Sequence, residues 1–168
     1  TCQIAPFKYV LDDGESEGRV DSDGTHTAWM NLMFVEAGHE TVTGIEVLMP
    51  ADQFGDPFGL YLWTDPDGNG IPDDCTVIAG IENLVVDRAE LLTFDFPRAV
   101  TIGPPGTPFF VGVVASTIDE FPATLDVDAP HTFGRSWIVG RNGPIDPNDL
   151  MEEVVEMNLI ELFVSGNW

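Results

Sequence analysis

One stretch of the chain passes directly from an alternating apolar run into an acidic loop: Phe58-Gly59-Leu60-Tyr61-Leu62-Trp63-Thr64-Asp65-Pro66-Asp67-Gly68-Asn69-Gly70. The first half has the period of two that is typical of a β-strand, so its apolar side chains divide between two faces. One face carries Phe58, Leu60 and Leu62, and the other carries Tyr61 and Trp63.

The second half, Asp65–Asp74, has the spacing of a calcium-binding loop. Oxygen-bearing side chains stand at its first, third, fifth and ninth places, and a glycine at the sixth permits a sharp turn. The loop departs from the EF-hand pattern at the twelfth place, where Thr76 replaces the bidentate glutamate. The predicted ligands are the side chains of Asp65, Asp67, Asn69 and Asp73 and the backbone carbonyl of Ile71, with Asp74 as a reserve carboxylate.

A polar hairpin turn is the alternative interpretation of the same residues. Asp-Gly and Asn-Gly pairs between apolar runs are strong hairpin signals, and Asp and Asn side chains also cap turns without a metal. Calcium accounts better for the charge, because four clustered carboxylates repel one another and the loop contains no lysine or arginine.

Composition limits the class of protein. The chain has 168 residues, of which 43% are hydrophobic, so we expect one globular domain, residues 1–168, with 1–27 as an irregular N-terminal strand and acidic loop. The formal net charge of -23 disfavours nucleic acid and anionic membranes as partners. No stretch is long and apolar enough to insert into a membrane. Because Thr1 is not an initiator methionine, we expect that a leader or tag was removed.

Cys2 and Cys75 are the two cysteines. An even count in a secreted chain permits one disulfide, which would close a long loop and stabilise the fold by about 4 kcal/mol. Such a bridge would tie the N-terminus to the exit of the acidic loop. Two separate thiols are the alternative.

Short alternating runs separated by turn signals predict an all-β fold, an antiparallel β-sandwich. One short helix is predicted at Asn148–Glu156. The predicted strands are Phe7–Val10, Ala28–Val35, Thr41–Met49, Phe58–Trp63, Thr76–Ala79, Glu82–Val86, Glu90–Phe96, Phe109–Ala115, Thr124–Val127, Phe133–Val139 and Met157–Val164.

Several short motifs resemble the jelly-roll-like β-sandwich domains of large secreted bacterial proteins. They are Tyr9–Gly14 (YVLDDG), Val42–Ile45 (VTGI), Leu62–Asp65 (LWTD), Phe109–Val113 (FFVGV), Phe121–Ala123 (FPA) before Asp126, Ser136-Trp137, and Gly166–Trp168 (GNW). The resemblance implies a jelly-roll-like fold, a secreted or extracellular location and membership of a longer chain. It implies no activity, because such domains are largely uncharacterised.

The motifs of catalysis are missing from the sequence. There is no Gly-x-Ser-x-Gly, no phosphate loop, and no zinc spacing among His26, His39 and His131. We therefore expect a non-catalytic module with a structural, adhesive or surface role. A secreted glycoside- or polysaccharide-active enzyme is a weaker alternative, since 29 acidic residues supply carboxylate pairs by chance.

A calcium-dependent carbohydrate-binding module is the second interpretation, with a polysaccharide or another extracellular surface component as partner. Flat aromatic side chains can stack on sugar rings. The candidates are Trp29, Tyr61, Trp63, Trp137 and Trp168. Their exposure discriminates the two interpretations, because an exposed row on one sheet face favours sugar binding and burial favours the structural role.

Overall fold

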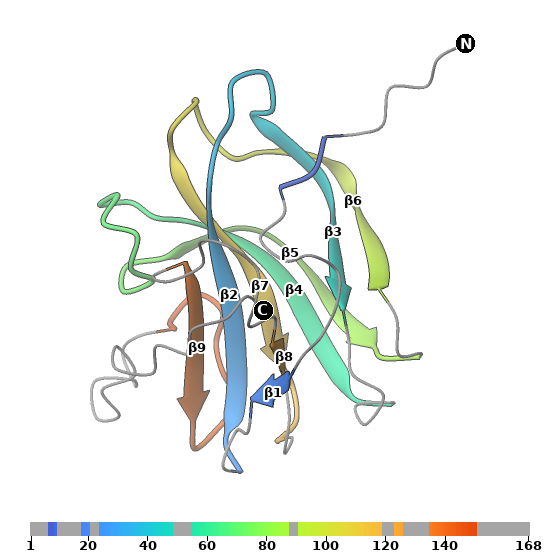
Figure 1. Ribbon diagram of the computed structural model, residues 1–168. Helices are drawn as coiled ribbons and strands as arrows, with labels where there is room; N and C mark the ends of the chain where they lie inside the picture. The colour runs from blue at the N-terminus through green and yellow to red at the C-terminus, as the bar shows by residue number, and fades with distance from the viewer. Residues whose placement is uncertain are drawn as a thin grey trace.

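The computed structural model describes residues 7–9, 18–20, 24–48, 55–87, 91–118, 123–125 and 135–150. These residues form strands and no helix (Figure 1). All the pairings between the strands are antiparallel, which confirms the all-β class. The strands are β1 (Gly18–Val20), β2 (His26–Phe34), β3 (Thr41–Leu48), β4 (Pro57–Thr64), β5 (Thr76–Val85), β6 (Leu91–Thr101), β7 (Pro108–Ala115), β8 (Ala123–Leu125) and β9 (Ser136–Arg141).

The largest sheet has five strands in the order β5-β4-β7-β2-β9. Strand β7 is its centre, and its nearly continuous run of aromatic and β-branched residues is typical of a strand buried on both faces. Strands β3 and β6 form a separate two-stranded sheet, and β1 pairs with β8 in another. The described part of the chain contains no helix that could cross a membrane.

Gly112 lies where β7 is tightly enclosed by its neighbours. It stands opposite Met30 of β2 on one side and Tyr61 of β4 on the other. A Cβ atom here would collide with the carbonyl oxygen of Trp29 and come within 2.6 Å of the Met30 Cβ. The centre of the sheet therefore requires glycine for close packing rather than for an unusual backbone angle.

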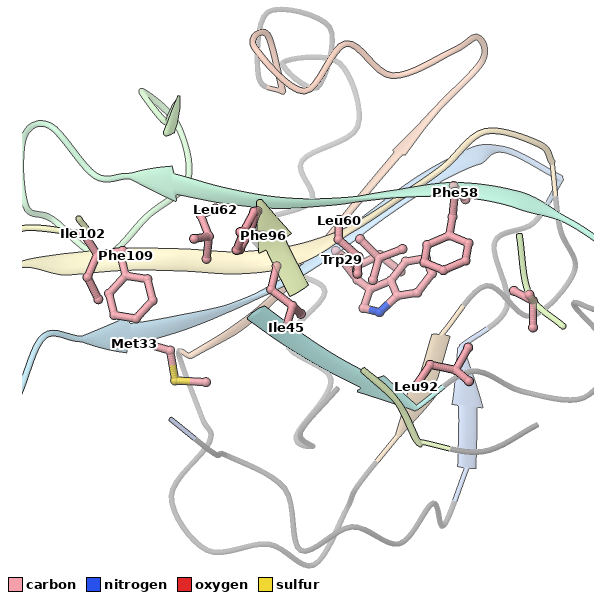
Figure 2. Packing of buried hydrophobic residues seen from close by; sticks show 14 of the residues in the cluster. Trp29, Met33, Ile45, Phe58, Leu60, Leu62, Leu92, Phe96, Ile102 and Phe109 are labelled. Atoms are coloured by element: carbon pink, nitrogen blue, oxygen red, sulfur yellow. The ribbon is translucent and has the colours of Figure 1, made fainter. Parts of the chain in front are cut away.

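The main core lies between the five-stranded sheet and the pair β3–β6. Figure 2 shows side chains of the large sheet packed against Ile45 of β3 and against Leu92 and Phe96 of β6. The large sheet contributes the predicted inward face of β4 to this core: Phe58, Leu60 and Leu62. Two antiparallel layers with a shared apolar interior are the arrangement expected of a β-sandwich.

The opposite face of the five-stranded sheet is also covered. Tyr61, Trp63 and Phe110 pack there with Ile145 and Leu150, which follow β9, and we call this group the second apolar cluster. The indole nitrogen of Trp63 donates a hydrogen bond of 2.7 Å to the carbonyl oxygen of Pro147. This segment after β9, residues 142–150, is therefore fastened across the sheet by both apolar contacts and a hydrogen bond, and we call it the covering segment.

Two strand predictions change in detail because of β-bulges. Alternation along the predicted strand Thr41–Met49 places Thr43 on the same face as Ile45, but the register shifts between Val42 and Gly44 and Thr43 is exposed. The two strands predicted at Thr76–Ala79 and Glu82–Val86 are one strand, β5, with two register irregularities against β4. Both differences arise from pairing between strands, which cannot be predicted from the alternation of residues along one strand.

Other differences lie toward the ends of the chain. Phe7–Tyr9 of the predicted strand Phe7–Val10 do not form a strand, and the predicted loop 11–27 contains β1 and the start of β2. Of the predicted helix Asn148–Glu156, residues 148–150 are described and are not helical. The backbone of Asn148 instead donates to the Asp146 side chain at 2.9 Å. The strand Met157–Val164 lies outside the described residues.

Candidate metal centre and the neighbouring aromatic residues

The acidic loop joins β4 to β5 and is organised around one buried carboxylate. Asp65 directly follows β4 and is only 5% exposed. Its two oxygens accept hydrogen bonds from the backbone nitrogens of Gly68, at 3.1 Å, and Gly70, at 2.7 Å. These two hydrogen bonds from the backbone of the loop hold the Asp65 carboxylate in place.

Asp67 and Asn69 form successive side-chain-to-backbone turns. The Asn69 nitrogen donates to Asp67 at 2.9 Å, and the Ile71 nitrogen donates to the amide oxygen of Asn69 at 2.6 Å. Gly68 and Gly70 have positive φ angles of 72° and 77°. The loop therefore needs glycine where the calcium pattern places it, and it curls the oxygen-bearing side chains toward one side.

Three carboxylates meet in this loop. Oxygen atoms of Asp65, Asp67 and Asp74 all lie within 4.8 Å of one another. Asp73, which the spacing placed among the ligands, is not in this group. Its carboxylate accepts a hydrogen bond of 3.3 Å from the Asn69 side chain. The structure thus brings two predicted ligands together with the reserve carboxylate.

The clustered aspartates affect the pKa values of the groups beside them. Desolvation, followed by the charges of Asp67, Asp65 and Asp73, raises the pKa of Asp74. Burial raises the pKa of the next residue, Cys75, to about 12, and the neighbouring aspartates add to the effect. A carboxylate that ionises among like charges gains most from a bound cation.

The donor set determines which cation would fit. The cluster offers three carboxylates, and carboxylate oxygens are ligands of calcium rather than of copper or a structural zinc. The residues present therefore fit the calcium that the spacing predicted.

The proposed bridge between Cys2 and Cys75 stays a prediction, because Cys2 lies outside the described residues. Cys75 is half-buried, directly precedes β5 and packs against the second apolar cluster.

Three of the aromatic residues proposed as a sugar-stacking platform, Trp29, Tyr61 and Trp63, are buried. Trp63 is 0% exposed, and Trp29 and Tyr61 are almost as inaccessible. Trp137 is half-buried and packs against the second apolar cluster, and Trp168 lies outside the described residues. The platform of Tyr61 and Trp63 on one sheet face is therefore wrong, because the covering segment occupies that face.

No protein-family model and no curated protein matches the chain. Two solved structures of the protein Cwp84 are similar in fold. One is the clostridial cysteine protease Cwp84 after propeptide cleavage, with 15% identity and a TM-score of 0.58 over 82% of this chain and 34% of that chain. The other holds the cysteine protease and lectin-like domains of Cwp84, a surface layer associated protein of Clostridium difficile, with 14% identity, a TM-score of 0.51, and coverage of 82% and 30%.

The chain therefore spans about a third of the length of these structures. At such low identity the likeness shows a shared all-β fold. It is consistent with the predicted sandwich domain of a larger protein.

Proposed function

We propose that this chain is a non-catalytic, jelly-roll-like β-sandwich module of a secreted or surface protein, with a structural or adhesive role, and that one calcium ion stabilises it. In this proposal Asp65, Asp67 and Asp74 supply carboxylates to the ion. Asn69 and the Ile71 carbonyl supply the remaining protein oxygens, and Asp73 orients Asn69.

The observation that carries the proposal is the convergence of three carboxylates at the junction of β4 and β5. The buried Asp65 is anchored by two backbone N–H groups, and Asp67 and Asp74 approach it to within 4.8 Å. A hairpin turn alone gains nothing from three carboxylates at this separation, whereas a divalent cation would remove their repulsion. Calcium sites of extracellular modules commonly have dissociation constants of about 10⁻⁴–10⁻³ M, which suits a short and partly exposed loop.

Two further observations support a structural role over a sugar-stacking one. The aromatic side chains of β4 are committed to the core, so they do not present a flat exposed surface. The fold resembles part of a surface layer associated protein, and because the described residues form strands only, we take the matching part to be its lectin-like region. A module of a larger surface protein is the role that this fold-level analogy suggests.

The test is thermal unfolding in excess EDTA and in millimolar calcium, with sodium chloride held high so that general screening is equal. Millimolar calcium is about ten times a dissociation constant of roughly 10⁻⁴ M, and at that ratio it stabilises by about 1.4 kcal/mol. For a domain of this size, we expect an increase in Tm of roughly 3–6 °C. Magnesium at the same concentration should have a much smaller effect, because it demands a stricter geometry.

Three variants separate the ligands. Asp67→Asn and Asp74→Asn should abolish the calcium-specific rise, while Asp73→Asn should retain most of it. Glu36→Gln, an exposed acid far along the chain from the loop, is the matched control for loss of one charge. Equal Tm values in calcium and EDTA would sink the metal proposal, and a loss confined to Asp73→Asn would return the ligand set to the one that the spacing predicted.

A further inference from the structure

Two Asn-Gly pairs occur in the sequence, Asn69-Gly70 in the acidic loop and Asn142-Gly143 at the start of the covering segment. Asparagine is a labile residue, most of all before glycine, because the next backbone nitrogen can attack the side-chain amide carbon and glycine has no Cβ to obstruct the approach. The fold places the same dipeptide in two different environments. The difference between these environments decides which pair can react.

The pair in the acidic loop is restrained at every reacting group. The Gly70 nitrogen, which would be the attacking atom, donates to the Asp65 carboxylate at 2.7 Å. The Asn69 amide nitrogen donates to Asp67 at 2.8 Å, and its oxygen accepts a hydrogen bond of 2.6 Å from the Ile71 nitrogen. These bonds are made by the chain itself, so they hold Asn69 away from the reactive geometry whether or not the loop binds calcium.

The pair at the start of the covering segment is unrestrained. Both residues lie just beyond Arg141, the last residue of β9, in a bend of the backbone. Asn142 is exposed, and among the described residues no hydrogen bond holds its side chain or the Gly143 nitrogen. A Cβ atom on Gly143 would have nothing within 4 Å, so the side chain and the backbone have open space in which to rotate toward each other.

The reaction that this freedom permits needs only water. The Gly143 nitrogen bonds to Cγ of Asn142, the bond from Cγ to Nδ2 breaks, and ammonia leaves with the proton that the Gly143 nitrogen gives up. Water then opens the resulting succinimide ring. Opening at Cγ leaves aspartate in an ordinary chain, whereas opening at the backbone carbonyl leaves isoaspartate, in which the chain runs through the former side chain. The net reaction consumes water and releases ammonia.

The position of this pair gives the reaction a structural consequence. Ile145, the first buried residue of the covering segment, is 8% exposed and packs in the second apolar cluster. Pro147 then accepts the hydrogen bond of Trp63. Isoaspartate at position 142 adds a backbone carbon between β9 and Ile145, so the segment can no longer reach its contacts along the same path. It also adds negative charge to a chain whose formal net charge is already -23.

We infer that Asn142-Gly143 is a site at which the folded protein modifies itself to isoaspartate, and that this modification loosens the covering segment. The acidic loop protects the other pair, Asn69-Gly70, from the same reaction. The attachment of the covering segment therefore depends on the age of the molecule.

Incubation of the folded protein in EDTA at mildly alkaline pH tests the site, with brief acidic digestion and mass spectrometry of the peptides. Asn142 should convert at least about a hundred times faster than Asn69, because at least two hydrogen bonds to charged or rigid partners must break before Asn69 can react. In urea, where neither environment persists, the two rates should agree to within a few-fold. Equal rates in the folded protein, or an Asn142 that converts only in urea, would overturn the assignment. Since no calcium is present, the metal proposal can fail while this one stands.

Gly143→Ala tests the role of the attacking residue. It should slow conversion of Asn142 at least about fivefold, the factor that corresponds to roughly 1 kcal/mol of backbone freedom lost with glycine. The open space around Gly143 lets the fold accept the methyl group. An unchanged rate in this variant would contradict attack by the Gly143 nitrogen.

Hydrogen exchange at residues 145–150 measures the loosening. Exchange should be faster in converted wild-type protein than in fresh protein, and Asn142→Gln, which cannot form the same ring, should not change on incubation. Asn142→Asp carries the new charge without the extra backbone carbon, so its exchange should match that of fresh protein. Unchanged exchange in converted protein, or equal acceleration in Asn142→Asp, would refute loosening through a lengthened backbone.

Discussion

Trp63 connects the centre of the sheet to the covering segment, and its replacement by phenylalanine measures that connection. The side chain is completely buried in the second apolar cluster, and its indole nitrogen donates to Pro147 at 2.7 Å. Trp63→Phe keeps an aromatic ring in the core but removes the donor and part of the ring volume. The change therefore isolates one hydrogen bond together with one cavity.

The expected loss has two parts. The smaller ring gives up buried apolar contact and leaves a cavity, at a cost of about 2 kcal/mol. The lost hydrogen bond adds about 1 kcal/mol. Unfolding free energy should therefore fall by about 3 kcal/mol, a large share of the stability of a domain of this size.

Urea denaturation measures the change, with a midpoint that should fall by roughly 1.5 M at an unchanged slope of about 2 kcal/mol per molar. Trp29→Phe is the matched control, because Trp29 is equally enclosed in the other cluster, on the opposite face of the sheet. It should lose the packing term without altering the covering segment. Hydrogen exchange at residues 142–150 should rise in Trp63→Phe and stay unchanged in Trp29→Phe.

The reasoning fails if Trp63→Phe costs less than about 1 kcal/mol, since a fully buried indole would then contribute no more than a surface residue. It also fails if both variants speed exchange in the covering segment equally. That result would show a general loss of stability rather than the loss of the link to Pro147.

Two further predictions concern Tyr61 of β4 and Gly112 at the centre of the sheet. Burial and the charge of Glu82 raise the pKa of Tyr61 to about 12. The protonated hydroxyl therefore contributes its full stabilisation of the fold below about pH 10, the pKa of tyrosine in the unfolded chain. That contribution is lost as the pH rises through about 12. Absorbance titration should show this late step in the native chain and not in Tyr61→Phe; a single step near 10 for the folded protein would contradict it. Gly112→Ala should lose more than about 4 kcal/mol or fail to fold, measured by circular dichroism, whereas Gly143→Ala, with open space around it, should stay within about 0.5 kcal/mol; equal stability of the two variants would refute the packing argument.

The sequence predicted strand identity well where alternation was strong. The division of β4 between two faces is confirmed residue by residue, because a period of two needs only local backbone geometry. The same pattern could not say whether the second face met solvent. That depended on the covering segment, which contacts Trp63 from 84 positions further along the chain.

Pairing effects account for most of the remaining differences. Two strands were predicted at Thr76–Ala79 and Glu82–Val86, yet β5 continues through Gly80, where the Tyr61 ring lies over the glycine. Strand β1 was hidden in an acidic stretch without periodicity, since its pairing with β8 is a tertiary event. The local β-propensity of a segment does not indicate which distant strand it pairs with.

Two of the predicted ligands, Asp65 and Asp67, lie in the carboxylate cluster, and the binding of calcium there stays a prediction. The spacing from Asp65 to Asn69 is a local property of a tight turn, and Gly70, the glycine of the pattern, has the positive φ angle of a sharp turn. The choice between Asp73 and Asp74 depended on how the chain leaves the loop after Pro72 and enters β5. Two adjacent aspartates carry no sequence signal that separates them, whereas the structure brings Asp74 to the cluster.

The bulge in β5 has a consequence for how copies of this chain meet one another. Strand β5 is an outer strand of the five-stranded sheet, and an outer strand with free N–H and C=O groups invites the edge of another molecule to pair with it. An extra residue, a left-handed Asn83 and an outward Glu82 interrupt the regular row of donors and acceptors at this edge. The irregularity thus hinders two molecules from pairing along this edge and growing into fibrils through their sheets.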